Sequence, residues 1–367
     1  MTSAPLVDVV IPVHTPARPI DRAVASVLDA TPAAAPAPGT VRVTVVCHGI
    51  PSAVIRERLG ALADDPAVRL VEFSDGVRSP AGPFNHGLEQ ATGEYVSIMG
   101  SDDFLEPGAM ADWVRAVEAE RPDAALVRLR YQGAGILDNP LTRRGRSTQL
   151  DAVRDRLFYR TAPLGLLRRQ LVVDLGLRFT ERLPVGKDMA FSAQLWVDAD
   201  RISYLREAGC YVIGDDADDR VTTMARPVVE AMAAPLDLVR RPWVRSGDEP
   251  VRRALVTKLL RIHVLGALRS RRTPASWSPA DVAAVRDATV ELLALSPRSV
   301  LPFSRAERAL VDAARVAQSP EDILQALARD ARPGRIARIL PRNLLHALDR
   351  ESVLTRYVLY RVGSHGR

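Results

Sequence analysis

The first hundred residues alternate short apolar runs with segments of helical spacing. The apolar runs have the length of buried strands and lie at 6–13, 41–46, 68–73 and 94–99. The helical segments lie between them, at 19–30, 53–62 and 83–93. Repeated strand–helix units of this length imply right-handed crossovers. We therefore predict an α/β fold whose Rossmann-like, mostly parallel sheet has helices on both faces.

The pattern changes twice further along the chain. From about 124 to 213 it becomes mixed, and it predicts strands at 124–130 and 201–206 and helices at 150–160 and from about Lys187 to Asp198. Beyond about 226 the spacing is helical throughout, with cap signals at 278–281, 304–307 and 319–322. These changes predict two domains, an α/β domain at 1–225 and an all-helical C-terminal domain at 226–367.

Composition narrows the classes of protein to consider. The chain is 47% hydrophobic and 26% charged, and it contains no apolar run long enough to cross a bilayer. The N-terminus lacks the features of a secretory signal. Cys47 and Cys210 are the only cysteines, so neither a disulfide framework nor a cysteine zinc site is indicated. We expect a cytoplasmic protein.

The net charge of +6 would suit an anionic partner, but the basic residues of the N-terminal half are dispersed, which argues against nucleic acid. Arginines cluster among apolar residues only at 252–272 and 332–363. These segments could contact the inner face of an anionic membrane peripherally, hold an anionic polymer, or pair subunits in a homo-oligomer. Alternatively, they form a helical bundle whose arginines are solvated.

Two adjacent carboxylates, Asp102 and Asp103, follow the strand at 94–99. In parallel sheets, ligands bind beyond the carboxyl ends of the strands, so both residues lie where a ligand is expected. They could cap the next helix or hold a cation. The pattern of that helix starts several residues later, so capping alone does not require both.

Three ordered motifs resemble the inverting GT-A glycosyltransferases of family 2. They are VDVVIPVHTPARPIDRAVASVL, FNHGLEQATGEYVSIMGSDDFLEPGAM and VGKDMAFSAQLW, and the resemblance covers roughly residues 5–215. It implies a nucleotide-binding half at about 1–110 and an acceptor half at about 111–225. It also implies Mg²⁺ or Mn²⁺ as cofactor, because hard cations bridging a diphosphate take carboxylate ligands.

The resemblance also assigns roles to residues. Asp102 would bind the metal and the nucleotide sugar, and Asp103 is a second metal candidate or a helix cap. Asp188 would be the general base that deprotonates the acceptor. The remaining residues expected at the nucleotide sugar are Pro12, Val13, His14, His48 and Asn85. For His48 and Asn85, a plain loop or helix-turn role is an equal alternative.

Three positions depart from the family pattern. Gly100 replaces the first Asp of the Asp-Ser-Asp-Asp stretch, Lys187 replaces the Glu before the base, and Cys47-His48 replaces the Asp pair at the second strand end. The last change removes a carboxylate that usually pairs with uracil. After the strand near 211, Asp215 or Asp216 could replace a metal-binding His, although a solvated acidic loop is the preferred interpretation.

The predicted function is transfer of a sugar from a UDP-, dTDP- or GDP-linked donor to a hydroxyl of a glycan, polymer or lipid-linked acceptor. The setting would be synthesis of cell-surface polysaccharide, teichoic-type polymer or glycolipid. Two alternatives remain open: a degenerate, non-catalytic GT-A module acting as a scaffold, and a metal-dependent nucleotidyltransferase. The second usually needs a glycine-rich phosphate loop, which IPVHTPARP is not.

Overall fold

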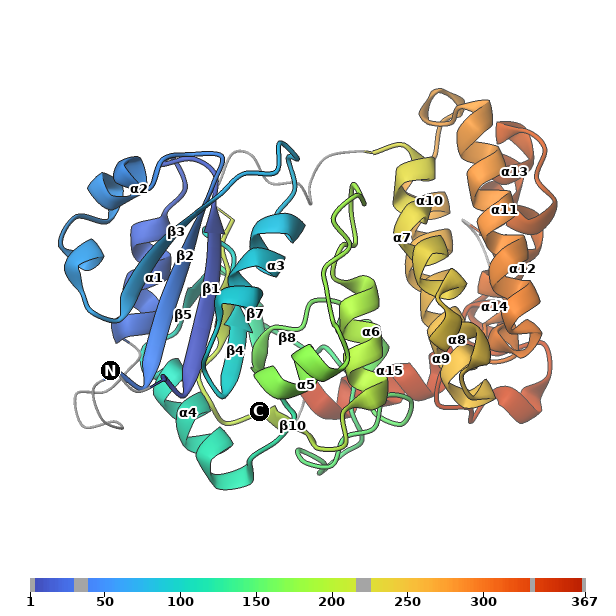
Figure 1. The fold of residues 1–367 in the computed structure, drawn as a ribbon. Coiled ribbons are helices and arrows are strands. Elements are labelled where there is room, and N and C mark those ends of the chain that lie inside the picture. Colours follow the sequence, from blue (N-terminus) through green and yellow to red (C-terminus); the bar gives the residue numbers. More distant parts are fainter. Residues whose placement is uncertain (1–3, 30–38, 216–225, 331–333, 365–367) are drawn as a thin grey trace.

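The computed structural model describes residues 4–29, 39–215, 226–330 and 334–364, and Figure 1 shows its arrangement. A seven-stranded sheet has the order β10-β6-β9-β4-β1-β2-β3. All neighbouring pairs are parallel except those made by β9, which is antiparallel to β4 and β6. The strands are β1 (Val7–Val13), β2 (Val41–His48), β3 (Val68–Phe73), β4 (Tyr95–Ile98), β6 (Ala124–Val127), β9 (Gly165–Arg168) and β10 (Ile202–Leu205). The predicted α/β fold is confirmed.

Helices cover both faces of this sheet, because alternate side chains of a strand point to opposite faces. On β1, Val7, Val9 and Ile11 join one apolar core, and Val10 joins the other. The first core includes residues of α1 (Ile20–Asp29), α2 (Ser52–Leu59) and α4 (Ala109–Glu120). The second includes residues of α3 (Ala81–Gln90) and α6 (Met189–Asp198), and the short helix α5 (Arg169–Asp174) follows β9.

A second, four-stranded sheet has the order β5-β11-β7-β8 and was not predicted from sequence. Its strands are β5 (Phe104–Leu105), β7 (Leu129–Tyr131), β8 (Ile136–Leu137) and β11 (Tyr211–Ile213). Pairing of β11 with β5 brings residues 211–214 against the segment that follows β4. The approach is so close that a Cβ at Gly214 would lie 1.9 Å from the backbone oxygen of Asp102.

The C-terminal region is helical, as predicted. It contains α7 (Val228–Arg240), α8 (Pro242–Ser246), α9 (Glu249–Leu259), α10 (Leu265–Ser270), α11 (Pro279–Leu295), α12 (Arg305–Val316), α13 (Pro320–Asp330), α14 (Arg335–Ile339) and α15 (Val353–Ser364). The capping boxes begin at Ser278 and Ser304, where the sequence places them. Apolar residues of α7 and α9 share one core with α6, so these helices pack directly on the sheet-containing part.

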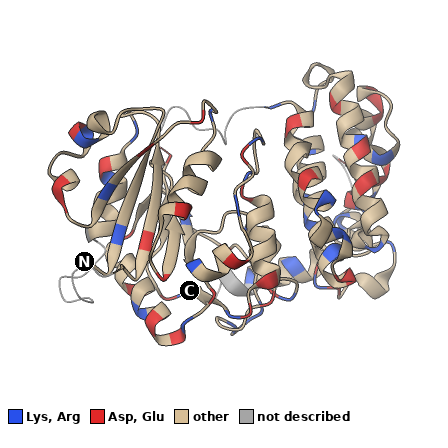
Figure 2. Cartoon of the chain, in the orientation of Figure 1, with Lys and Arg blue, Asp and Glu red and all other residues tan. Residues whose placement is uncertain are grey.

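Helix α15 runs back beneath α6 (Figure 1). A buried polar network fixes its start. The Glu351 carboxylate lies 3.0 Å from Arg156 Nε and 3.1 Å from Arg261 Nη1, and it accepts a hydrogen bond from the Tyr159 hydroxyl at 2.9 Å. Among the helices in the described part of the chain, none is long and apolar enough to span a bilayer. Figure 2 shows basic and acidic residues interspersed over both the sheet and the helices.

The helix predicted at 150–160 is wrong. That segment forms turns and one 3-10 helix (Leu157–Tyr159). The reason is the buried Asp155 carboxylate, which accepts hydrogen bonds from the backbone N–H groups of Asp151 and Arg143 and pairs with the Arg143 side chain. Local side-chain bonds of this kind compete with the helical ladder. Arg156 also has a positive φ of 54°, which is incompatible with a continuous α-helix through this segment.

Candidate active site

The carboxyl ends of β1, β2 and β4 meet at one edge of the main sheet. Parallel pairing aligns Val13 with Cys47 and Val10 with Ile98, so the segments following these strands are neighbours. Pro12 and Val13 are buried at the end of β1, and His14, the next residue, is exposed. The predicted residues Pro12, Val13, His14, His48 and Asp102 are therefore brought to the same edge.

Two arginines near the start of α1 hold Asp102. Arg18 Nη1 lies 2.8 Å from Asp102 Oδ2, and Arg22 donates a hydrogen bond to the backbone oxygen of Asp102. The Arg22 guanidinium also lies over the Phe104 ring, 4.6 Å from its centroid. Sequence reasoning missed both arginines, because nothing in the pattern shows that the start of α1 faces the end of β4. They place positive charge beside the expected metal-binding carboxylate.

Asp103 has a structural role. Its carboxylate accepts hydrogen bonds from the Tyr211 hydroxyl at 2.5 Å and from Gly214 N at 2.9 Å, which ties this loop to β11. Burial and the neighbouring Asp102 charge raise the pKa of Asp103 to about 6. The prediction that Asp103 caps the next helix is wrong, since α4 has Gly108 at its N-cap and no side-chain cap bond. With both oxygens bonded to protein donors, Asp103 also fits poorly as a metal ligand.

Gly100, the first departure from the family pattern, is required by this packing. A Cβ at position 100 would lie 2.6 Å from Asp103 Oδ2 and 3.1 Å from Asp102 Oδ1. Gly100 N also donates a hydrogen bond to the Tyr211 hydroxyl at 3.1 Å. An aspartate at this position would collide with the Asp103 carboxylate in its present orientation, so the missing carboxylate is linked to the structural use of Asp103.

His48 is paired with a carboxylate that the sequence did not indicate. His48 Nε2 lies 2.7 Å from Asp75 Oδ1, just beyond the end of β3. Burial opposes ionisation of Asp75, but hydrogen bonds from His48 and Val77 N outweigh it, so the pKa of Asp75 is lowered. Gly82 makes room for this carboxylate, because a Cβ there would lie 2.2 Å from Asp75 Oδ2. Asp75 therefore restores an acidic group near the strand end where the family aspartates are missing.

Asn85, also expected at the nucleotide sugar, is held by hydrogen bonds within the protein, which favours the alternative structural role. It is buried, and its amide oxygen accepts a hydrogen bond from Phe179 N at 2.8 Å. Its amide nitrogen donates to the Phe179 backbone oxygen at 3.0 Å and to Glu181 Oε1 at 2.8 Å. Both the amide oxygen and the amide nitrogen of Asn85 are thus bonded to protein groups rather than directed at a nucleotide sugar. Asn85 instead anchors the segment that leads to Asp188.

Asp188 stands at the N-cap of α6, near the end of that anchored segment. Thr180 N donates to Lys187 O at 2.9 Å and closes the turn before it. The Asp188 side chain makes no capping hydrogen bond, so capping does not account for the residue. Its surroundings raise the pKa of Asp188 to about 6, chiefly through burial, while Lys258 and Lys187 partly oppose the shift. A carboxylate with such a pKa is well suited to accept a proton near neutral pH.

Both lysines near Asp188 are themselves perturbed. Burial lowers the pKa of Lys258 to about 8, and Asp188 opposes that shift. Lys187 donates a hydrogen bond to Pro184 O at 3.1 Å, and burial, with Arg226 nearby, lowers its pKa. Lys258 belongs to α9, so the helical region contributes a cation to the environment of the expected base. Sequence reasoning did not detect this contribution.

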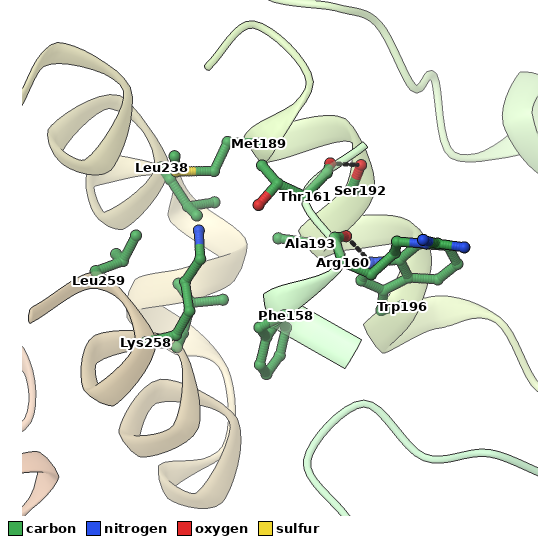
Figure 3. Close-up of a pocket in the computed structure, with 11 residues that line it drawn as sticks. Phe158, Arg160, Thr161, Met189, Ser192, Ala193, Trp196, Leu238, Lys258 and Leu259 are labelled. Atoms are coloured by element: carbon green, nitrogen blue, oxygen red, sulfur yellow. Dashed lines mark hydrogen bonds between the residues drawn. The ribbon is translucent and has the colours of Figure 1, made fainter. Parts of the chain in front are cut away.

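A small cavity of about 10 Å³, room for about one water molecule, lies where α6 faces α7 and α9. In Figure 3 the Lys258 side chain rises along this cavity toward Leu238 and Met189. On the far side, Trp196 Nε1 donates to the Arg160 backbone oxygen at 2.9 Å. The cavity is too small for a sugar, so it is not itself a binding pocket for a donor or an acceptor.

No cluster of three or more His, Cys, Asp or Glu side chains suited to a metal ion occurs in the part of the chain that the structure describes. Asp215 is exposed, and Asp216 lies outside the described residues. Asp102 nevertheless fits the one carboxylate that Mg²⁺ commonly takes when phosphate and water supply its other ligands. Its carboxylate is partly accessible, and only Oδ2 is engaged by Arg18.

Comparisons with known proteins identify the relatives of this chain. Residues 8–176 match the family model described as glycosyl transferase family 2. Staphylococcus aureus TarS, a poly(ribitol-phosphate) beta-N-acetylglucosaminyltransferase, is 26% identical over 133 residues, which cover 36% of this chain and 23% of TarS. A Bacillus spizizenii poly(ribitol-phosphate) beta-glucosyltransferase is 21% identical over 147 residues, which cover 40% of this chain and 23% of that protein. The aligned region thus spans about a quarter of these relatives.

Solved structures extend the likeness in fold to most of the chain. The crystal structure of S. aureus TarS 1–349 in complex with UDP-GlcNAc superimposes with a TM-score of 0.70 at 18% identity, covering 88% of this chain and 90% of that one. The same fragment in complex with UDP gives a TM-score of 0.64 at 20% identity, with the same coverage of both chains. Residues 8–176 therefore carry a domain that matches glycosyl transferase family 2, and the likeness to the TarS structures shows the predicted GT-A fold.

Proposed function

We propose that this protein is an inverting glycosyltransferase that moves a sugar from a UDP-linked donor to a hydroxyl of a polyol-phosphate polymer of the cell surface. The family domain and the activities named for the TarS and Bacillus relatives support this proposal. The observation that carries it is Asp188, a carboxylate with a raised pKa, no capping bond and a position where the family pattern places the base.

In the proposed reaction, Asp188 accepts the proton of the acceptor hydroxyl. The freed oxygen forms a bond to the anomeric carbon, on the face opposite the leaving group, while the bond from that carbon to the phosphate oxygen breaks. UDP departs with the bonding electrons, and the anomeric configuration inverts. General base catalysis of this kind typically contributes about 10²–10⁴ in rate.

Negative charge develops on the departing diphosphate, and Arg18 and Arg22 lie on the strand edge where it would sit. Their guanidinium groups would stabilise the charge by direct hydrogen bonds. A divalent cation held by Asp102 would supply further stabilisation of the same charge. Metal dependence is part of the proposal and is tested separately by the addition of EDTA.

His48 and Asp75 form the proposed contact with the nucleobase of the donor. A carboxylate can accept a hydrogen bond from the ring N–H of uracil. An imidazole whose Nε2 faces Asp75 can donate to a uracil carbonyl oxygen through Nδ1–H in its protonated form. The 2.7 Å contact between His48 and Asp75 holds both groups in place before the nucleotide binds. This pair would replace the aspartates that the second strand end lacks. The choice of UDP over dTDP and GDP is supported by the TarS structures in complex with UDP-GlcNAc and UDP.

Calorimetric titration with UDP, dTDP and GDP, each with and without Mn²⁺, tests the donor assignment. Incubation of the full chain with UDP-GlcNAc or UDP-glucose and isolated poly(ribitol phosphate) then tests the transfer by release of UDP and gain of polymer mass. We expect UDP to bind and at least one donor to react. Absence of heat with every nucleotide, together with an unchanged polymer, would overturn the proposal.

A further inference from the structure

Half of the exposed large hydrophobic side chains of the described residues lie near the C-terminus. Of the 16 such residues, eight lie between Ile336 and Tyr360, and the others are dispersed from Val54 to Val316. Within this group of eight, the most exposed are Leu345 at 85% and Leu348 at 83%, followed by Ile336, Leu344, Tyr360 and Tyr357. Single exposed apolar residues are normal on a soluble protein, whereas contiguous apolar patches mark interaction surfaces, so this concentration within one stretch makes the stretch the candidate for such a surface.

The exposed charged side chains of this stretch are all arginines. Arg335, Arg338, Arg342 and Arg361 are exposed in the same stretch, and Arg342 pairs with Asp312 at 2.8 Å. The only carboxylates between 334 and 361 are Asp349 and Glu351. Asp349 lies 2.5 Å from Arg253, and Glu351 belongs to the buried network with Arg156 and Arg261. What remains exposed in this stretch is therefore apolar, cationic or uncharged.

The two helices of this stretch are fixed to the body of the protein. Helix α14 follows Gly334 and contacts α15, and Arg305 N donates to the Leu340 backbone oxygen at 2.9 Å. On α15, Tyr357, Tyr360 and Arg361 share one side, because residues three and four positions apart are neighbours on a helix. The buried network at Glu351 anchors the other end of this helix. The exposed groups are thus presented on an ordered support.

We propose that this C-terminal surface, made of the exposed apolar residues and arginines between 335 and 361, docks on an anionic lipid bilayer. Leucine and isoleucine side chains gain free energy by entering the acyl boundary, tyrosines favour the headgroup region, and arginines attract anionic headgroups. A second copy of the chain is a poorer occupant, because a two-fold interface would bring these arginines against their equivalents. An anionic polyol polymer would leave the leucines in water.

The inference goes beyond the proposed glycosyl transfer and does not depend on it. Flotation of the full chain with vesicles measures it without any sugar donor. We expect flotation with an equal mixture of phosphatidylcholine and phosphatidylglycerol and none with phosphatidylcholine alone, and weaker binding when salt rises from about 0.1 M to about 1 M.

Two sets of variants separate the apolar and electrostatic contributions. Each arginine near an anionic surface contributes about fivefold to partitioning, so R335Q together with R338Q should weaken binding about 25-fold. Replacing Leu344, Leu345 and Leu348 by Ser should abolish flotation. The matched control replaces Val173, Val290 and Val316 by Ser, since these residues are also exposed but lie elsewhere, and it should float like the unmodified chain.

Light scattering of the same proteins without lipid examines the rival occupant. A mass near twice 40.1 kDa for the unmodified chain that falls to 40.1 kDa in the leucine variant would show that a second copy covers this surface and would overturn the proposal. Failure to float with anionic vesicles, or equal flotation of the unmodified chain and the leucine variant, would overturn it as well.

Discussion

The pKa of Asp188 predicts how the reaction should depend on pH. If Asp188 is the base, kcat/KM follows the fraction of its carboxylate that is ionised. With a pKa of about 6, that fraction is about 91% at pH 7 and about 9% at pH 5, so kcat/KM should fall about tenfold. With the ordinary value of 3.8, about 94% would remain ionised at pH 5 and the rate would hardly change.

The assay is UDP release at fixed donor and acceptor concentrations, with circular dichroism at each pH to show that the protein stays folded. Asp103 needs a control, because its pKa is also raised to about 6. The acidic limb should persist in D103N and vanish from the residual activity of D188N. A flat profile between pH 5 and 7 in the unmodified protein, or an acidic limb that survives in D188N, would refute the assignment of Asp188 as base.

Four further predictions concern single residues. At pH 7, the free energy of unfolding of D188N should be up to about 3 kcal/mol larger than that of the unmodified chain, because the raised pKa of Asp188 means that folding disfavours its ionised form. Below pH 3.8 the two proteins should be equally stable. Equal stability at pH 7 in a denaturant titration would contradict this prediction. K258M should move the acidic limb of kcat/KM to higher pH, since Lys258 lowers the pKa of Asp188; a limb that stays in place excludes that role. H48A should weaken UDP binding about tenfold in calorimetry while the melting temperature changes little, and unaltered affinity would remove His48 from the nucleotide site. N85A should lower the free energy of unfolding by about 2–3 kcal/mol with little change in UDP affinity. Unchanged stability with weaker UDP binding would show instead that Asn85 contacts the nucleotide sugar.

The main sheet and the helical region could be predicted from sequence because their patterns are local. Strand runs at 6–13, 41–46 and 68–73 and the capping boxes at Ser278 and Ser304 need no knowledge of distant contacts. The antiparallel strand β9 and the small sheet were not predicted, since each consists of four or fewer residues per strand and is defined by partners far away in sequence. The predicted helix at 150–160 is wrong for a related reason, the burial of Asp155.

For the candidate site, the sequence prediction names Asp102 and Asp188 from the family motifs, and both roles stay predictions. It was incomplete where function depends on long-range packing. Arg18, Asp75 and Lys258 come from different elements, and no spacing in the sequence links them to the residues they contact. Asn85 shows the converse, because a motif position that suggests ligand binding is used to hold residues 179–181.

The central claim is that Asp188 is the proton acceptor of a UDP-sugar transferase. The most direct measurement compares D188N with the unmodified chain for UDP affinity and for sugar transfer to poly(ribitol phosphate) in the same preparation. We expect D188N to bind UDP with unchanged affinity and to turn over at least about 100-fold more slowly. A D188N protein that transfers sugar at the original rate would contradict it.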